Sequence, residues 1–148
     1  MPMRCRPIGP IVLILAAMAI AGAGAAPKPA EPEACPIEDF TEDAREKLLQ
    51  DASSCDKALD LFRACSLGAS GDVALGAIVV EKCEAGFLNR LTREQRRTYD
   101  REQGRCQNKY RRESGTMYRS FEAFCGAELA RNYARRYPAP KGAAPAQK

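Results

Sequence analysis

The residues of this 148-residue chain best suited to chemistry are its cysteines, because thiols can crosslink, bind a metal or act as nucleophiles. Cys5 precedes an apolar N-terminal run, and six cysteines follow it. Among these six, the two closest in sequence are ten residues apart, and the chain has no histidine. Zinc sites favour CxxC pairs or Cys/His mixtures. We therefore predict no metal site and three disulfides among Cys35, Cys55, Cys65, Cys83, Cys106 and Cys125.

The chain has few other residues suited to catalysis. Without histidine there is no Ser-His-Asp or Cys-His arrangement and no imidazole base. Two carboxylate pairs, Glu81 with Glu84 and Asp39 with Glu42, would share a helix face and could act on a glycosidic bond. In a chain this charged, such pairs are mostly solvated surface. We expect a protein that is not an enzyme and carries no cofactor.

Charge is divided unevenly along the chain. Residues 26–89 hold 6 Lys/Arg against 13 Asp/Glu, and residues 90–136 hold 13 against 6. Arg93, Arg97 and Arg101 form one stripe at four-residue steps within the basic part. This stripe is either a solvated helix face or a contact with an anionic envelope glycan or lipid. Export, which the N-terminal residues indicate, disfavours nucleic acid as its partner.

The N-terminus has the features of an export signal. Arg4 and Arg6 precede an apolar run over residues 8–20, and small residues follow it over 21–26. The run is shorter than the roughly 20 residues needed to span a bilayer, so we expect no membrane-spanning segment. We place cleavage after Ala25, which removes Cys5. Residues 1–25 are then a signal peptide, 26–34 a disordered Pro/Ala-rich linker, 35–137 the folded domain and 138–148 a disordered Pro/Ala/Lys tail. The mature protein is expected to be periplasmic or secreted.

The elements that must hold these residues are helices. Apolar residues recur at three- and four-residue steps, and Thr41, Ser54 and Thr92 stand where N-caps are needed. Gln95, three residues after Thr92, completes a capping-box spacing. Gly68 is expected to end the second helix. The pattern predicts an all-α, disulfide-stabilised bundle of about five helices built from hairpins, over residues 40–50, 54–66, 70–91, 92–112 and 117–137.

Hairpin symmetry narrows the fifteen possible cysteine pairings. Residues equidistant from the turn of an antiparallel hairpin face each other. A turn at Gly115 and Thr116 brings Cys106 to Cys125, and a turn at Ala69 brings Cys55 to Cys83, which leaves Cys35 with Cys65. The alternative for the first four cysteines is Cys35 with Cys55 and Cys65 with Cys83.

Four short features follow one another in the second half of the chain. They are Phe87-Leu88-Asn89-Arg90-Leu91, Gln95-Arg96 eleven residues before Cys106, Gly115-Thr116, and Cys125 followed by Leu129 and Arg131. In these features the chain resembles the small exported domain family named after the lysozyme inhibitor LprI. The resemblance covers about residues 79–136. At two places the chain differs from the usual family pattern, with Thr98 in place of Trp and Glu102-Gln103 in place of Arg-Asp.

The resemblance implies an α-helical binding protein outside the cytoplasm, with lysozyme as one partner to test. The turn at Gly115, Thr116, Met117 and Tyr118 could enter a partner's cleft, because a disulfide-braced tip loses little freedom on binding. Acidic residues early in the domain could steer a basic lysozyme. The alternative function is a passive envelope or stress-protection protein whose basic helix lies on anionic glycan or lipid. The acidic residues are Glu38, Asp39, Glu42, Asp43 and Glu46.

Overall fold

The computed structural model describes residues 34–138, and these residues form an all-α fold. The expected signal peptide, the linker up to residue 33 and the tail from residue 139 lie outside the described residues. Within 34–138 there are five α-helices, one 3-10 turn and no strand, as the sequence pattern predicted. The elements are α1 (Glu42–Gln50), α2 (Cys55–Cys65), α3 (Asp72–Phe87), η1 (Leu88–Arg90), α4 (Arg93–Lys109) and α5 (Thr116–Arg136).

Three helices begin at the predicted caps. The side-chain oxygens of Thr41 and Ser54 accept hydrogen bonds from backbone amides in the first turns of α1 and α2. Thr92 accepts from the backbone amide of Gln95, while the Gln95 side chain accepts from the Thr92 amide, which completes the capping box of α4. These bonds satisfy amides that a helix N-terminus otherwise leaves without partners.

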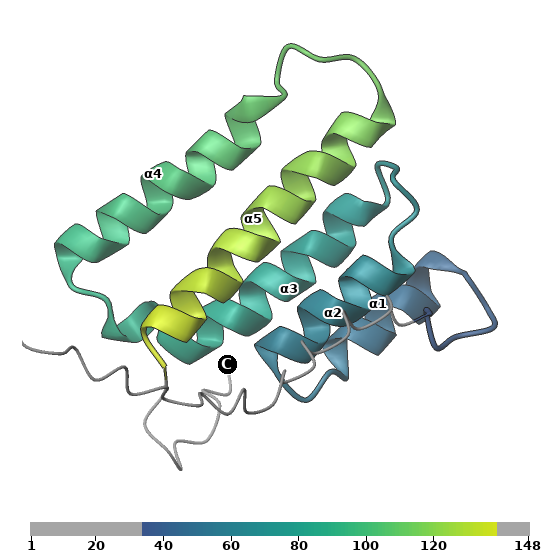
Figure 1. Cartoon of the computed structure of the whole chain (residues 1–148), viewed down its shortest axis with the longest axis horizontal. Coiled ribbons are helices and arrows are strands. Elements are labelled where there is room, and N and C mark those ends of the chain that lie inside the picture. The colour runs from purple at the N-terminus through teal and green to yellow at the C-terminus, as the bar shows by residue number, and fades with distance from the viewer. Residues whose placement is uncertain (1–33, 139–148) are drawn as a thin grey trace, which may run out of the picture.

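Helices α3 and α5 lie side by side at the centre of the array and run in the same direction (Figure 1). Asp72 contacts Ser120 at their N-terminal ends, and Phe87 contacts Tyr133 near their C-terminal ends. The two backbones approach closely, because a Cβ on Gly76 would lie only 2.8 Å from the Cβ of Ala123. In Figure 1, α4 forms one edge of the array beside α5, while α2 and α1 lie on the other side of α3.

The core is continuous across all five helices and is rich in aromatic rings. Phe87, Tyr99 and Tyr133 meet at ring-centroid distances of 4.8–5.8 Å and join α3, α4 and α5. Phe62 of α2 stacks on Phe124 of α5 at 4.2 Å. These contacts combine burial with favourable ring geometry. The remaining large buried apolar residues are Leu49, Leu59, Leu61, Leu75 and Val79.

Three disulfides tie the helices together: Cys35–Cys65, Cys55–Cys83 and Cys106–Cys125. They are the pairs that hairpin symmetry favoured, and the alternative pairing of the first four cysteines is not formed. The bonds join the N-terminal segment to the end of α2, α2 to α3, and α4 to α5. They separate their partners by 30, 28 and 19 residues, so each stabilises the fold by about 3 kcal/mol through loop closure in the unfolded chain.

Three helix ends differ from the sequence-based expectation. The second helix ends at Cys65 rather than at Gly68, because the amides of the following loop bond to the Asp72 side chain instead. The third helix ends at Phe87, where Arg90 in the 3-10 turn donates to the freed carbonyl of Gly86. The fourth ends at Lys109, since residues 108–113 form successive turns in place of a helical ladder.

Candidate functional site

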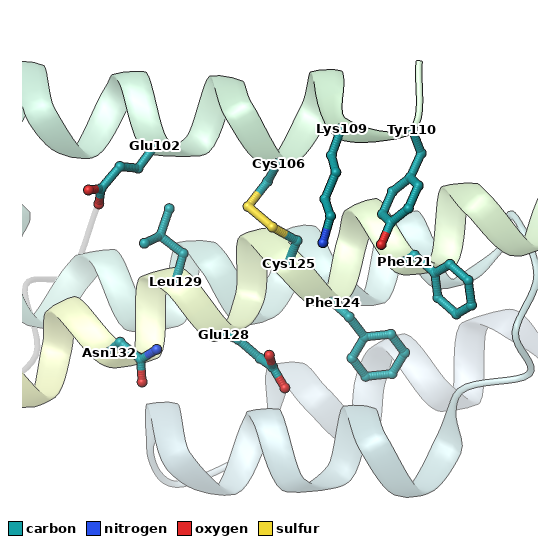
Figure 2. Close-up of a pocket in the computed structure, with 10 residues that line it drawn as sticks. All are labelled: Glu102, Cys106, Lys109, Tyr110, Phe121, Phe124, Cys125, Glu128, Leu129 and Asn132. Atoms are coloured by element: carbon teal, nitrogen blue, oxygen red, sulfur yellow. A yellow bond between two sulfur atoms is a disulfide. The ribbon is translucent and has the colours of Figure 1, made fainter. Parts of the chain in front are cut away.

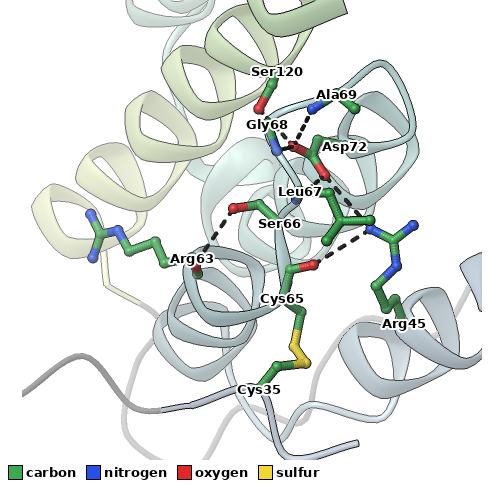
Figure 3. A network of polar contacts seen from close by, with 10 residues as sticks. All are labelled: Cys35, Arg45, Arg63, Cys65, Ser66, Leu67, Gly68, Ala69, Asp72 and Ser120. Carbon is green, nitrogen blue, oxygen red and sulfur yellow. Dashed lines mark hydrogen bonds and ion pairs between the residues drawn. A yellow bond between two sulfur atoms is a disulfide. The ribbon is translucent and has the colours of Figure 1, made fainter. Parts of the chain in front are cut away.

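A buried polar network fixes the end of the bundle from which α3 and α5 begin (Figure 3). Its centre is Asp72, whose side chain is fully buried. Asp72 accepts hydrogen bonds from the backbone amides of Leu67, Gly68 and Ala69 at 3.0, 2.8 and 3.2 Å. The Ser120 hydroxyl of α5 donates to the same carboxylate at 2.7 Å. One side chain therefore shapes the α2–α3 loop and joins it to α5.

Arg45 supplies the positive charge of this network from α1. Its Nη1 lies 3.7 Å from Oδ1 of Asp72 and donates to the carbonyl of Cys65 at 3.5 Å. The Arg45 residue is only 5% exposed, and its Nε has no hydrogen-bond partner. An ion pair this buried holds α1 against α3, because separating the two charges would leave each of them buried with neither a counter-charge nor water around it.

The α4–α5 hairpin is braced by a disulfide and by one glutamine. Cys106–Cys125 crosslinks the last turn of α4 to the middle of α5 (Figure 2). One turn before Cys106, the Gln103 amide donates to the Tyr99 hydroxyl and to the Gly126 carbonyl, at 2.7 and 3.1 Å. Gly126 leaves room for this contact, since a Cβ there would lie 3.0 Å from Oε1 of Gln103. The hairpin is thus held covalently and by hydrogen bonds.

The predicted turn residues lie at the tip of this hairpin. Gly115 adopts a φ of 118°, which few other residues tolerate, and α5 starts at Thr116. Tyr118 is half-buried because it packs on Tyr110 at the end of α4. Met117 is 47% exposed, as is appropriate for a residue free to contact a partner. Of the predicted tip residues, Tyr118 therefore serves mainly hairpin packing and Met117 remains available.

Phe121, one turn further along α5, belongs to the same surface. It is 41% exposed and contacts both Tyr110 and Tyr118, at ring-centroid distances of 5.7 and 6.1 Å. We call Tyr110, Met117, Tyr118 and Phe121 the tip patch. In the sequence, Phe121 falls on the apolar stripe of an amphipathic helix, a position that ordinarily predicts a buried side chain.

A groove runs from the tip patch along the α4–α5 seam (Figure 2). Its volume is about 730 Å³, and the Cys106–Cys125 disulfide lies in its wall beside Leu129 and Phe124. Charged groups stand along it: Lys109 on α4, Glu102, which accepts from the Tyr133 hydroxyl, and Glu128, which pairs with Arg63 at 2.8 Å. The groove is open, partly apolar and bordered by charges of both signs.

One carboxylate of each pair considered for catalysis is engaged in a structural contact. Glu84 accepts a hydrogen bond from the Tyr99 hydroxyl at 2.8 Å, while Glu81 is exposed. Asp39 accepts from the amide and hydroxyl of Thr41 at the start of α1. Neither pair forms an isolated acid–base pair. Among residues 34–138 no group of three or more His, Cys, Asp or Glu side chains could hold a metal ion.

Two tyrosine hydroxyls have raised pKa values for structural reasons. Burial, opposed by the Gln103 hydrogen bond and reinforced by that to Glu84, raises the pKa of Tyr99 well above its ordinary value. Burial also raises the pKa of Tyr133, and its hydrogen bond to Glu102 acts in the same direction. Both hydroxyls therefore stay protonated donors to carboxylates across the physiological pH range.

The predicted basic and acidic surfaces lie at opposite edges of the array (Figure 1). Arg93, Arg97 and Arg101 are exposed on α4. The acidic residues Glu42, Asp43 and Glu46 lie on α1, and Glu38 and Asp39 lie just before it. The structure therefore brings the tip residues together with one another but not with the acidic segment.

No family model, curated protein or solved structure matches the chain in the comparisons made with known proteins. Of the helices within residues 34–138, none combines the length and the apolar character needed to cross a bilayer.

Proposed function

We propose that this chain is an exported, non-enzymatic binding protein of the LprI-like class that acts on a protein partner in the cell envelope or outside the cell, with a lysozyme as the first candidate. The proposal joins the sequence resemblance to the physical character of the α4–α5 hairpin.

The observation that carries the proposal is the exposed tip patch on a rigid support. Met117 and Phe121 remain 47% and 41% exposed although the chain has few large apolar residues. Contiguous exposed apolar and aromatic side chains are typical of protein contact sites. The neighbouring disulfide and Gln103 hold the two helices in place. A partner would therefore bind with little loss of conformational entropy in this hairpin.

The groove beside the tip patch extends this surface. Its apolar wall at Phe124 and Leu129 could take a side chain of the partner, and Glu102 could face its basic groups, whereas Glu128 is already paired with Arg63. Lysozymes are commonly basic, so acidic groups along the groove favour their approach. The acidic residues of α1 lie at the other edge of the bundle and would contribute only to long-range steering.

Export is supported by the N-terminal signal pattern and by the crosslinks. Three disulfides within one small domain are typical of oxidising compartments, because cytosolic thiols are kept reduced. A non-enzymatic role is supported by the lack of histidine in the whole chain and by the structural use of Glu84 and Asp39.

The test is lysozyme turnover on bacterial cell walls, measured with the oxidised protein and two single variants. We expect near-stoichiometric inhibition by the wild type, and inhibition at least about tenfold weaker for Phe121→Ser, a loss of the size seen for buried interface anchors. Phe40→Ser is the matched control, because Phe40 is 47% exposed but lies before α1, outside the tip patch. It is expected to inhibit as the wild type does.

Other outcomes would overturn the proposal. Salt-sensitive retention on envelope material without inhibition would favour the passive envelope role instead. Release of sugar products from peptidoglycan by the protein alone would contradict a non-enzymatic function. Equal inhibition by both variants would remove the tip patch as the contact surface.

A further inference from the structure

Four arginines on α4 form a linear array that the tip patch does not include. Arg93, Arg97, Arg101 and Arg105 follow one another at four-residue steps. With a rise of 1.5 Å per residue, each step advances about 6 Å, and the array extends over about 18 Å. We call these four residues the arginine ladder.

The ladder lies on the outward face of the outermost helix. At 100° per residue its four members occupy a sector opposite Tyr99 and Cys106, the two buried residues of α4. All four arginines are exposed. In Figure 1, α4 forms the edge of the array, and no described helix covers its far side.

In the described part of the chain, the ladder arginines have no carboxylate partner, which they share with Arg90, Arg111, Arg112 and Arg136, but among these only the ladder forms a row along one helix face. Elsewhere Arg45 pairs with Asp72, Arg63 with Glu128, Arg119 with Glu122, and Arg135 with Asp56. Among residues 34–138, no carboxylate lies within ion-pair distance of a ladder guanidinium; Arg101 donates only to the Thr98 hydroxyl. Asp100 on the same helix pairs with Arg96, which is not part of the ladder.

This arrangement costs stability within the helix. Like charges at four-residue spacing repel by roughly 0.2–0.5 kcal/mol per pair. Glu94 lies in the same sector of the helix, about 100° around from Arg93, but its carboxylate forms no ion pair with any of the four arginines; the ion pair within α4 joins Arg96 to Asp100. A row of unneutralised charge that weakens its own helix is better explained by an external anion than by folding.

We propose that the arginine ladder binds a linear anionic glycan. Guanidinium groups bind carboxylate and sulfate oxygens through paired hydrogen bonds, and a straight row of them matches an anion-bearing chain that lies along the helix. The whole-protein charge is small, so the attraction is local to α4 rather than a property of the molecule.

Two other polyanions fit this face less well. A membrane-surface helix inserts large apolar side chains between the lipid headgroups. The exposed large apolar residues of the fold are Phe40, Leu67, Val73, Met117 and Phe121, and none of these lies on α4. Single-stranded nucleic acid needs exposed aromatic rings beside the basic groups, whereas Tyr99 of α4 is buried. The ladder offers guanidinium groups without large exposed apolar or aromatic side chains beside them, and an anionic glycan can bind to such groups through its charges.

The test uses fluorescently labelled alginate oligosaccharide as the probe, with anisotropy measured over a series of salt concentrations. We expect wild-type binding whose log–log dependence on salt has a slope of about −2 or steeper. The ladder variant carries Arg93→Gln, Arg97→Gln and Arg105→Gln, and should bind at least about tenfold more weakly at low salt, because three of its four contacts are gone.

The matched control removes the same three charges elsewhere. It carries Lys47→Gln, Arg63→Gln and Arg135→Gln, whose charges are already paired with Asp51, Glu128 and Asp56. Its affinity should stay within about twofold to threefold of the wild type, since net charge alone is not the cause of binding. The melting temperature of the ladder variant should equal or exceed that of the wild type, which separates lost binding from lost structure.

The inference fails if the wild type does not bind the probe, if its binding is independent of salt, or if both triple variants lose affinity equally. Stronger binding to phosphatidylglycerol vesicles than to the glycan would also overturn it. Because the ladder and the tip patch share no residue, lysozyme inhibition and glycan binding can each fail without the other.

Discussion

Replacing Asp72 by asparagine tests the buried network most sharply, because asparagine keeps the shape of the side chain and changes only its charge and one set of bonds. Oδ2 of Asp72 accepts from Gly68, Ala69 and Ser120, and Oδ1 faces the Leu67 amide and Arg45. Both oxygens therefore face donors. Whichever way the asparagine amide is turned, its NH2 group must face donors as well.

The expected loss of unfolding free energy is taken from the more favourable of the two orientations of the asparagine amide. With the asparagine oxygen at the Oδ2 position, three hydrogen bonds survive, while the Leu67 amide loses its acceptor and the buried Arg45 loses its counter-charge. Breaking a buried ion pair from one side costs about 3–5 kcal/mol. Small domains have stabilities of about 5–15 kcal/mol. We therefore expect Asp72→Asn to remove a large fraction of the free energy of unfolding.

The assay is urea unfolding followed by circular dichroism, with the disulfides intact. We expect a lower midpoint at unchanged slope, and a melting temperature reduced by about 12 °C or more. Asp60→Asn is the matched control, because Asp60 pairs with Arg63 at 3.6 Å on the surface and is 58% exposed. Such a pair contributes about 0.2–1 kcal/mol.

A double-mutant cycle isolates the ion pair within that loss. In an Arg45→Met background the buried positive charge is gone, so Asp72→Asn should cost less by about 1–3 kcal/mol. A cost for Asp72→Asn below about 1 kcal/mol, or one equal to that of Asp60→Asn, would refute the reasoning. Equal costs in both backgrounds would show that Arg45 and Asp72 are not coupled.

Three further predictions concern the helix packing, the hairpin brace and the alkaline limit of the fold. Gly76→Ala should destabilise the protein by about 1–3 kcal/mol in urea unfolding, because the new Cβ would lie 2.8 Å from the Cβ of Ala123. The control is Gly86→Ala, whose new Cβ would have nothing within 4 Å, and it should be neutral or stabilising by up to about 1 kcal/mol. Replacing both cysteines of Cys106–Cys125 by alanine should cost about 3 kcal/mol, and an unchanged urea midpoint would contradict the loop-closure argument. The pKa of Tyr99 is raised in the folded protein and is near its ordinary value of about 10 in the unfolded chain. The unfolded chain therefore loses this proton first, and the free energy of unfolding should fall as the pH rises above about 10. Tyr99→Phe should make this fall shallower when unfolding is measured against pH, and an equally steep fall would refute the assignment.

The parts of the fold that sequence reasoning predicted depend on local signals. Caps at Thr41, Ser54 and Thr92 are set by side chains that bond amides three residues on, so they can be seen in the sequence itself. The disulfide pairs followed from hairpin symmetry for the same reason, since a short turn fixes which residues face each other.

The parts that sequence reasoning missed depend on contacts between distant segments. Asp72 lies in the first turn of a helix, where acidic residues are common, and nothing in the local sequence shows that it bonds to Ser120, 48 residues away. Nothing in the local sequence marks Arg45 as buried, because its burial depends on where α1 packs. The same applies to the parallel pairing of α3 and α5, because no hairpin joins those two helices. Local periodicity carries no information on such pairings.

The candidate site also has features that the sequence predicts and one that it does not. The tip turn at Gly115 and the arginine stripe on α4 could be located from the sequence, because turns and four-residue steps are local. The exposure of Phe121 could not, since an apolar residue in an amphipathic helix is ordinarily expected to face the core.

The account as a whole depends on an oxidised, exported and processed protein, and the intact mass of the protein isolated from its own cells tests that most directly. We predict a chain that lacks residues 1–25 and is lighter than its reduced form by the six hydrogens of three disulfides, with Cys35–Cys65, Cys55–Cys83 and Cys106–Cys125 recovered as linked peptides. A full-length chain with free thiols at these six positions would contradict it.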